Sequence, residues 1–363
     1  MSDLNQAAVE SSLKGITDPH TGRDIVTSKL VREIEVKDDT VKIKLVFTYP
    51  AKGWHDALKA EIVTAVGAID RSAKVNVDIS TEVTSHSAQK GVQPIANVKN
   101  IIAVASGKGG VGKSTVSVNL ALALSAEGAT VGILDADIYG PSQPRMLGVS
   151  SKPESSDGKS LEPLTSYHLQ AMSIGFLIDE ETPMIWRGPM VTQALEQLLK
   201  DTRWRDVDYL IIDLPPGTGD TQLTLAQKVP VSGAVIVTTP QDIALLDARK
   251  AVKMFEKVEI PILGVVENMS THICSNCGHE EHIFGEGGGQ KMASDYDIEF
   301  LGDIPLDRSI REDTDGGRPT VVADPDGRLA MNYREIARNI AGRLSSRKRD
   351  YSDKFPSIVI QNN

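Results

Sequence analysis

The stretch Gly107-Lys108-Gly109-Gly110-Val111-Gly112-Lys113-Ser114-Thr115 decides the fold of this 363-residue chain. It follows an apolar run over residues 101–105, which predicts a buried strand, and it precedes a segment of helical periodicity over 115–127. Strand, glycine-rich loop and helix are the setting that a phosphate-binding loop requires. Glycines let backbone N–H groups approach a polyphosphate because no Cβ intervenes, and the helix N-terminus adds positive charge.

Three residues of this loop carry specific chemistry. Lys113 supplies a positive charge for the terminal phosphates, and the Ser114 hydroxyl is a ligand for Mg²⁺. Lys108 is unusual, because an ordinary phosphate loop needs no charge at its second position. The form K-G-G-V-G-K-S resembles the deviant Walker A loop of the MinD/ParA-type ATPases, which implies that Lys108 reaches the ATP of a partner subunit across a nucleotide-sandwich dimer. A turn that binds nothing and a solvated lysine are the alternatives, and the context disfavours both.

The composition describes a globular protein with an acidic balance. The formal net charge is −10, the sequence pI is about 5.3, and 40% of residues are hydrophobic. Acidic proteins are poor general binders of nucleic acid. The first residues are polar and no run reaches the ~18 apolar residues of a membrane span, so we expect a cytoplasmic protein without membrane binding.

Residues 1–88 predict a small α+β accessory domain, followed by a linker at 89–98. Helical spacing and strand alternation predict, in order, a helix at 4–15, strands at 31–36 and 40–49, a helix at 55–69 and a strand at 74–79. This pattern, with the corner Thr48-Tyr49-Pro50, resembles a small domain that occurs alone in iron–sulfur assembly factors. Stand-alone relatives often carry a cysteine after that proline, but Ala51 follows here, so no thiolate role is transferred.

A βα rhythm runs over residues 99–345, and a charged tail follows at 346–363. Continuous apolar strands that alternate with amphipathic helices predict an α/β domain, a P-loop NTPase with a mostly parallel sheet covered by helices on both faces. The expected strands are 101–105, 130–134, 169–173, 209–212, 234–238, 262–266 and 299–301; the expected helices are 115–127, 191–200, 221–228, 244–258, 288–296 and 327–344.

Aspartates follow two of these strands. Acidic groups at the carboxyl end of a strand hold Mg²⁺ through water and orient an attacking water. The segment D-A-D-I-Y-G-P-S resembles switch I of MinD-type ATPases, which implies that Asp135 lies in the outer shell of Mg²⁺ and that Asp137 positions the hydrolytic water. Asp213 ends the strand Y-L-I-I-D in the Walker B pattern, and the D-L-P-P-G-T-G-D segment that it opens resembles switch II. Solvated loop aspartates are the alternative.

Two further positions are assigned to the adenine base by resemblance alone. In the wider ATPase family an asparagine after one strand and the backbone near a proline after another lie against the base. The matching residues here are Asn268 and Pro305. A cap of a turn is nearly as good an interpretation of Asn268.

Cys274 and Cys277 form a C-x-x-C-G pattern whose two sulfurs converge on one metal. The chain holds two cysteines, whereas an iron–sulfur cluster normally requires four thiolates. Two chains would supply four, and Lys108 already implies a dimer, so a bridging [4Fe–4S] cluster on the two-fold axis accounts for both features. Zinc bound with nearby histidines, a redox dithiol and unliganded cysteines are the alternatives.

Six motifs occur in order from about residue 97 to 345, and together they resemble the Mrp/ApbC family of ATP-binding iron–sulfur cluster carrier proteins. They are G-K-G-G-V-G-K-S-T, D-A-D-I-Y-G-P-S, W-R-G-P-M (186–190), D-L-P-P-G-T-G-D, T-T-P-Q-D-I-A-L (238–245) and E-N-M-S-x-H-I-C-S-N-C-G. The resemblance implies a homodimeric, slow Mg-ATPase that carries a [4Fe–4S] cluster between assembly scaffold proteins and recipient apoproteins. A nucleotide-switched scaffold with structural zinc and a MinD/ParA-like positioning ATPase are the alternatives.

Overall fold

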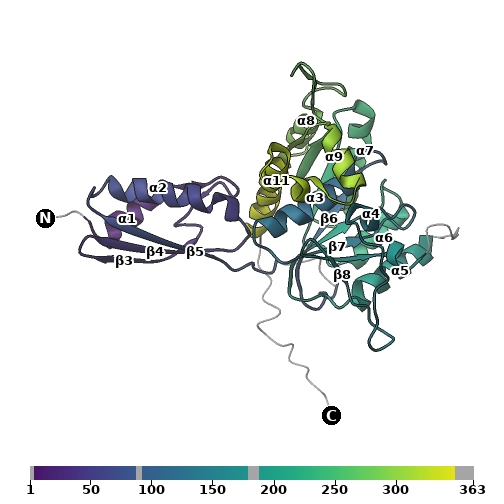
Figure 1. The fold of residues 1–363 in the computed structure, drawn as a ribbon, viewed down its shortest axis with the longest axis horizontal. Helices are drawn as coiled ribbons and strands as arrows, with labels where there is room; N and C mark the ends of the chain where they lie inside the picture. Colours follow the sequence, from purple (N-terminus) through teal and green to yellow (C-terminus); the bar gives the residue numbers. More distant parts are fainter. Residues whose placement is uncertain (1–3, 87–91, 179–187, 348–363) are drawn as a thin grey trace, which may run out of the picture.

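A mixed eight-stranded sheet organises the larger part of the chain (Figure 1). The computed structural model describes residues 4–86, 92–178 and 188–347. Neighbouring strands run parallel except β8, which pairs antiparallel with β9 at one edge. In spatial order the strands are β15 (Phe300–Ile304), β12 (Ile262–Asn268), β11 (Gly233–Thr238), β6 (Val98–Ala105), β10 (Val207–Asp213), β7 (Val131–Asp135), β9 (Leu169–Ser173) and β8 (Leu164–Ser166).

Helices flank this sheet, which confirms the predicted fold class. Helix α11 packs on α3 and on β15, while α7 packs on β11 and α5 packs on α6. All seven predicted strands of this part and all six of its predicted helices are present. The sequence did not predict α4, α9, α10, β8 or the two short strands β13 (His272–Ile273) and β14 (Glu280–Glu281). The helices are α3 (Lys113–Ala126), α4 (Gln143–Met146), α5 (Gly188–Asp201), α6 (Asp220–Lys228), α7 (Asp242–Lys257), α8 (Gly288–Asp295), α9 (Arg308–Asp315), α10 (Thr320–Ala323) and α11 (Arg328–Ser345).

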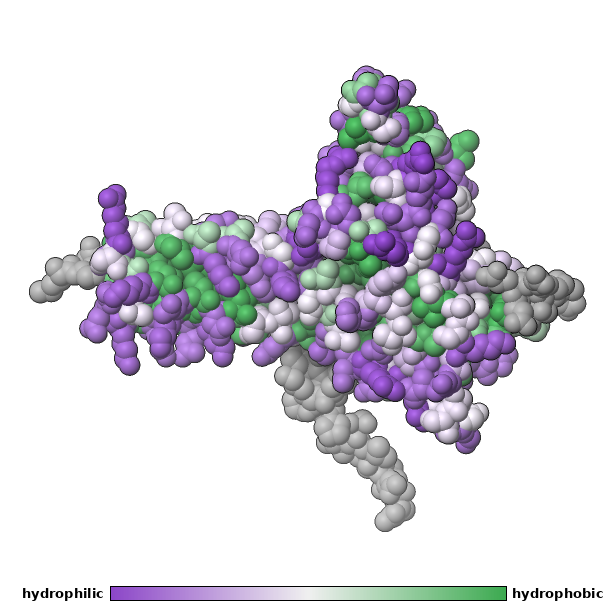
Figure 2. Space-filling model, viewed as in Figure 1, coloured by the Kyte–Doolittle hydropathy of each residue, from purple (hydrophilic) through white to green (hydrophobic). Residues whose placement is uncertain are grey.

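The N-terminal part is a small α+β unit that extends to the side of the sheet in Figure 1. Strand β4 (Thr40–Phe47) pairs antiparallel with β3 (Val31–Lys37) and parallel with β5 (Lys74–Thr81). Helices α1 (Gln6–Leu13) and α2 (His55–Gly67) pack on this sheet, and a short ladder joins β1 (Thr17–Asp18) to β2 (Arg23–Asp24). Alternation along β4 turns Val41, Ile43 and Leu45 inward, where they are fully or almost fully buried. Figure 2 shows hydrophilic residues over much of this face of the larger part, and a green, hydrophobic area bordered by hydrophilic residues across the small unit.

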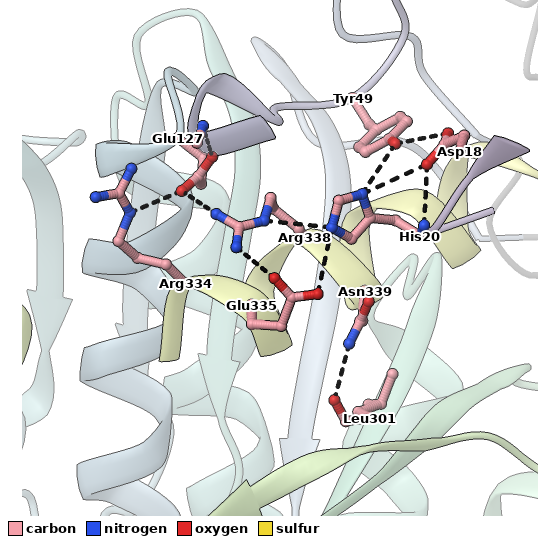
Figure 3. Close-up of polar contacts among 10 residues, drawn as sticks. Asp18, His20, Tyr49, Glu127, Leu301, Arg334, Glu335, Arg338 and Asn339 are labelled. Atoms are coloured by element: carbon pink, nitrogen blue, oxygen red, sulfur yellow. Dashed lines mark hydrogen bonds and ion pairs between the residues drawn. The ribbon is translucent and has the colours of Figure 1, made fainter. Parts of the chain in front are cut away.

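The two parts meet through buried charged groups (Figure 3). Glu127, the residue after α3, accepts hydrogen bonds from Arg334 Nε and Arg338 Nη1 of α11, both at 2.7 Å, and from the Gly53 N–H at 2.6 Å. His20 lies between Asp18 and Glu335, with ring nitrogens 3.4 Å from a carboxylate oxygen of each. A buried charge is stable only when it is paired and hydrogen-bonded, so these contacts fix how the small unit sits on α3 and α11.

No helix among the described residues is long and apolar enough to cross a membrane. The tail from residue 348 onward lies outside the described residues.

Candidate nucleotide and metal-binding site

The phosphate loop joins β6 to α3, and two of its glycines are required by their neighbours. A Cβ on Gly107 would lie 2.1 Å from the backbone carbon of Asp247 in α7. Gly112 has φ 79° and a Cβ there would lie 2.2 Å from the Asn268 amide nitrogen. Glycine is the residue that tolerates both the close approach and the left-handed backbone. The loop is therefore held between α7 on one side and the end of β12 on the other.

Lys113 and Asp213 form a buried ion pair at the base of this loop. Lys113 Nζ contacts Asp213 Oδ1 and lies 3.2 Å from Ser114 Oγ, and the two charged side chains are 5% and 0% exposed. Ser117, one turn further along α3, donates to the same carboxylate oxygen at 2.9 Å. The residues that the sequence assigns to phosphate and Mg²⁺ are thus in direct contact, with the lysine acting as the cation beside Asp213.

Asp135 lies beside Asp213, because the two residues are register partners at the ends of β7 and β10. Its carboxylate accepts hydrogen bonds from the backbone N–H groups of Asp137, Ser142 and Gln143 at 3.0–3.1 Å and from Ser173 Oγ at 3.1 Å. Burial and the nearby Asp213 charge raise the pKa of Asp135 to about 7. Asp135 therefore shapes the 137–143 loop and also favours a cation in front of the two carboxylates.

Asp137 is half-buried in that same loop. Burial raises the pKa of its carboxyl group and the charge of Lys113 opposes this effect. Its backbone carbonyl accepts from the Gly140 N–H at 3.3 Å, which closes a turn and leaves Tyr139 64% exposed. The predicted water-positioning residue thus lies within the electrostatic reach of the P-loop lysine.

The donor set fits Mg²⁺. A hydroxyl from Ser114 and carboxylates from Asp135 and Asp213 are oxygen ligands of the kind this ion takes, directly or through its waters. Two buried carboxylates side by side favour a positive charge; Lys113 pairs directly with Asp213, and its charge also acts on Asp135.

The loop after Asp213 is closed by a residue that sequence reasoning did not single out. Gln222 in α6 accepts from the Gly219 N–H at 2.6 Å and donates to the carbonyls of Pro215 and Pro216. The Gly217 N–H donates to the Ser106 carbonyl at 3.0 Å, which ties this loop to the start of the phosphate loop. The predicted switch II segment is therefore a pre-shaped loop that contacts the P-loop.

Asn268 and Pro305 lie at the ends of β12 and β15. Asn268 Nδ2 donates to the Val111 carbonyl at 2.8 Å, so in this structure the asparagine buttresses the phosphate loop. Pro305 is buried, and the next residue, Leu306, donates from its N–H to the Thr271 carbonyl at 2.7 Å. The assignment of both residues to the adenine base stays a prediction.

Cys274 and Cys277 occupy a tight turn between β13 (His272–Ile273) and β14 (Glu280–Glu281). The Cys274 N–H donates to the His279 carbonyl and the Gly278 N–H donates to the Cys274 carbonyl, at 2.9 and 2.8 Å. The backbone N–H groups of Asn276 and Cys277 lower the pKa of the Cys274 thiol, as does the Cys277 side chain. Both cysteines are free and accessible, which suits them to bind a soft metal.

Among the described residues, no group of three or more His, Cys, Asp or Glu side chains is placed to hold a metal ion. The Nδ1 atoms of His272 and His282 face the carbonyls of Leu306 and Ser270. Within the described residues, Cys274 and Cys277 are thus the two thiols that this turn brings together.

Helix α7 lies between the phosphate loop and the segment that follows the cysteine turn. Its backbone touches Gly107, and Gly288 of α8 packs so closely that a Cβ would lie 2.6 Å from Leu245 Cδ1. Three apolar side chains are exposed on α7 and after the cysteine turn, namely Ile243, Leu246 and Ile283 at 68, 54 and 48%. The motif T-T-P-Q-D-I-A-L runs from the end of β11 into the first turn of this helix, whereas Trp186 and Arg187 of W-R-G-P-M lie outside the described residues.

Fold and site together define a P-loop NTPase of the MinD/ParA type. Residues 97–341 match the family described as NUBPL iron-transfer P-loop NTPase, and residues 6–79 match the family described as iron–sulfur cluster assembly protein. The chain is 50% identical to an iron–sulfur cluster carrier protein of Salmonella typhimurium over 94% of this chain and 93% of that protein. It is 50% identical to the iron–sulfur cluster transfer protein NUBPL of Mus musculus over 73% of this chain and 84% of that protein. The chain belongs to this family of iron-transfer P-loop NTPases.

Solved structures agree with this assignment. A nucleotide-binding protein of Archaeoglobus fulgidus, determined in complex with ADP and with cobalt, is 39% identical, covers 65% of this chain and 91% of its own, and superposes with a TM-score of 0.55. The cell division ATPase MinD of Pyrococcus furiosus, at 24% identity and a TM-score of 0.50 over 66% of this chain and 98% of its own, shares the fold.

Proposed function

We propose that this protein is an ATP-dependent iron–sulfur cluster carrier, in which two copies of the chain hold one [4Fe–4S] cluster and pass it to recipient apoproteins. The names of its relatives support the carrier role. The observation that carries the proposal is the isolated pair of accessible thiols at Cys274 and Cys277, with no further ligand placed to complete a metal site in the described part of the chain. A cluster normally requires four thiolates, and a second copy supplies the other two.

The dimer would bring the α7 faces and the cysteine turns of two copies together. The exposed side chains of Ile243, Leu246 and Ile283 favour burial against another apolar surface. Lys108 supports the same arrangement, because its resemblance to the MinD/ParA lysine assigns it to the ATP of the partner subunit. Scaffold proteins that load the cluster and apoproteins that receive it are the expected partners, in the cytoplasm.

At the nucleotide site, ATP replaces the internal ion pair. Lys113 moves from Asp213 to the terminal phosphates, and backbone N–H groups of residues 107–115 cradle the phosphate oxygens. Mg²⁺ at Ser114, with Asp135 and Asp213 in its outer shell, would neutralise phosphate charge. Asp137 accepts a hydrogen bond from the attacking water and orients it, and we expect hydrolysis to be slow.

Helix α7 offers a route from ATP to the cluster. It contacts the phosphate loop at Gly107 and α8 at Gly288, and α8 follows the cysteine turn. A shift of α7 on dimer closure would therefore move both regions. Such coupling requires that ATP bind the open and closed states with different affinity.

Anaerobic reconstitution tests the proposal. Iron, sulfide and zinc are assayed against native mass for the wild type, Cys274→Ala and a matched control, Ser275→Ala, in the same turn. About four iron and four sulfide per dimer, lost in Cys274→Ala alone, support the bridging cluster. One zinc per monomer without sulfide would overturn the carrier role and favour a nucleotide-switched scaffold.

A second assay tests the role of ATP. Reconstituted wild type and Lys113→Ala are compared for cluster transfer to an apo-ferredoxin, with and without Mg-ATP. ATP should change the transfer rate of the wild type and leave that of Lys113→Ala unchanged. Equal transfer by both proteins under all conditions would remove ATP from the mechanism.

The alternative of a positioning ATPase has its own test. Sedimentation with lipid or DNA that depends on ATP would favour that function instead.

A further inference from the structure

Gln143, the first residue of α4, lies at the meeting point of three parts of the nucleotide site. Its side-chain Nε2 donates to the Ser114 carbonyl at 3.1 Å and to Asp213 Oδ2 at 3.0 Å. Its backbone N–H donates to Asp135 Oδ2 at 3.1 Å. One residue thus links the phosphate loop, the end of β10 and the end of β7, and it is 1% exposed.

The other end of this amide has no partner. Gln143 Oε1 is buried without a hydrogen bond among the described residues, and so is Oγ of the preceding residue, Ser142. Turning the amide over would not help, because it would place Oε1 against a carbonyl and a carboxylate, which are both acceptors. A buried acceptor without a donor loses the hydrogen bonds that it made to water, so native proteins rarely leave one without a partner. The site therefore calls for a donor at Gln143 Oε1.

A water molecule bound to Mg²⁺ is the donor that the surroundings favour. Mg²⁺ keeps several of its waters when it binds to a protein and a polyphosphate, and those waters donate strongly. The carboxylates of Asp135 and Asp213, which would attract the ion, both bind Gln143. Lys113 already occupies Asp213 Oδ1, whereas Gln143 holds Oδ2, so the glutamine can keep Asp213 in place when the lysine leaves for phosphate.

We propose that Gln143 is a positioning residue for the magnesium shell: its Oε1 accepts a hydrogen bond from a water ligand of Mg²⁺, while its Nε2 fixes Asp213 and the backbone of Ser114. This inference rests on the proposed Mg-ATP site. It adds a residue that neither the motif patterns nor the family resemblance assigned, and it explains why a neutral polar side chain is buried among charged ones.

Nucleotide titration with and without the metal tests this role. The affinity for a fluorescent ADP is measured in excess Mg²⁺ and in EDTA, and the ratio of the two reports the contribution of the metal. Gln143→Leu fills a similar volume and removes both polar ends. The ratio should fall about 10-fold, as for other residues that support metal ligands. Gln170→Leu is the control, since that glutamine bonds to the Arg205 backbone at the far end of β9.

The outcomes are separable. A wild-type protein with equal ADP affinity in Mg²⁺ and EDTA would overturn the proposed Mg-nucleotide site itself. A wild type that needs Mg²⁺, with an unchanged ratio in Gln143→Leu, would overturn only the role of Gln143. If Gln143→Leu fails to fold, Gln143→Asn is the second variant. Its side chain is one methylene shorter, so the amide oxygen and nitrogen lie further from their partners, and the ratio of ADP affinities in Mg²⁺ and EDTA should fall as well. Binding of Mn²⁺ followed by electron paramagnetic resonance gives a readout that is independent of hydrolysis, and Gln143→Leu or Gln143→Asn should weaken Mn²⁺ binding in the presence of ADP.

Discussion

The Glu127 carboxylate accepts a hydrogen bond from the Gly53 N–H at 2.6 Å, and this contact joins the end of the phosphate-loop helix to the small N-terminal unit. Helix α3 begins at Lys113 in the nucleotide site and ends one residue before Glu127. The same carboxylate binds Arg334 and Arg338 of α11 (Figure 3). The small unit is thus seated on the far end of the helix that binds phosphate.

Gly53→Ala should weaken the contact between the small N-terminal unit and helices α3 and α11. A Cβ at residue 53 would lie 2.4 Å from Arg338 Nη1 and 2.9 Å from Glu127 Oε1, so the buried ion pair would have to move. We expect a loss of about 1–3 kcal/mol in the free energy of unfolding, measured by denaturant titration, together with faster protease cleavage between β5 and β6. Gly67→Ala is the matched control, because nothing lies within 4 Å of its Cβ position and alanine is favoured there in α2. Equal stability of the two variants would contradict a tight junction at Gly53.

Glu127→Gln should lower the free energy of unfolding more than the loss of a surface carboxylate does. The Glu127 side chain is fully buried, and its removal leaves the guanidinium groups of Arg334 and Arg338 short of a counter-charge. We expect a loss of about 3 kcal/mol in the free energy of unfolding. Glu196→Gln breaks two ion pairs with Lys200 and Lys228 at the surface and should cost less than about 1 kcal/mol. A difference below the error of the titration would mean that water reaches the junction.

His20 should make the junction sensitive to pH. Burial opposes protonation of the ring, but hydrogen bonds to Asp18 and Glu335 outweigh it and raise the pKa of His20 above 6.5. The same contacts lower the pKa of Glu335 to about 2. When the His20 ring is neutral, its Nε2 accepts a hydrogen bond from Arg338 Nε at 3.3 Å. When the ring is protonated, Nε2 donates to Glu335 Oε1 instead. The Tyr49 hydroxyl faces the other ring nitrogen, Nδ1. The junction holds three carboxylates and two guanidinium groups, so a protonated His20 ring would balance the remaining negative charge.

Because the folded pKa is raised, the stability that this charge contributes is fully present below about pH 6.5 and is lost as pH rises through the folded pKa. We therefore expect the stability difference between wild type and His20→Gln to shrink as the pH is raised, in parallel denaturant titrations. His168→Asn, at an exposed position, is the control for the loss of a histidine in itself. A pH-independent difference for His20→Gln would mean that the ring stays neutral in the fold.

The fold was predictable because each βα unit carries its own local signal. The strands β6, β7, β10 and β11 are continuous apolar runs, and their carboxyl ends necessarily meet at one edge of a parallel sheet. The proximity of Asp135 and Asp213 to the phosphate loop followed from that geometry. Short elements gave no such signal: α4 and α10 have four residues each, too few for a helical period to emerge.

Residues held by tertiary contacts were not predictable in the same way. Gln143 follows a proline-containing loop, and only the N–H groups that converge on Asp135 bring its side chain to Asp213. Glu335 lies more than 300 positions along the chain from Asp18 and His20, and nothing in the local patterns pairs it with them. Charged residues on a helix such as α11 are ordinarily solvated, so their burial at a junction appears only in the structure.

Alanine substitutions at Gly110 and Gly112 of the phosphate loop distinguish the cost of a left-handed backbone from the cost of a steric clash. Gly110 and Gly112 have φ of 82° and 79°, so alanine at either position carries a cost of about 1–2 kcal/mol for the left-handed backbone. Only at Gly112 does the new Cβ also strike a neighbour, the Asn268 amide at 2.2 Å, whereas nothing lies within 4 Å at Gly110. In nucleotide-free protein, Gly112→Ala should therefore lower the melting temperature more than Gly110→Ala. Adding Asn268→Ala to Gly112→Ala should recover part of that loss, because it removes the colliding group, while the same change in the Gly110→Ala background should only destabilise. Equal melting temperatures for the two glycine variants would show that Asn268 yields freely, and that its bond to the Val111 carbonyl does not hold the loop.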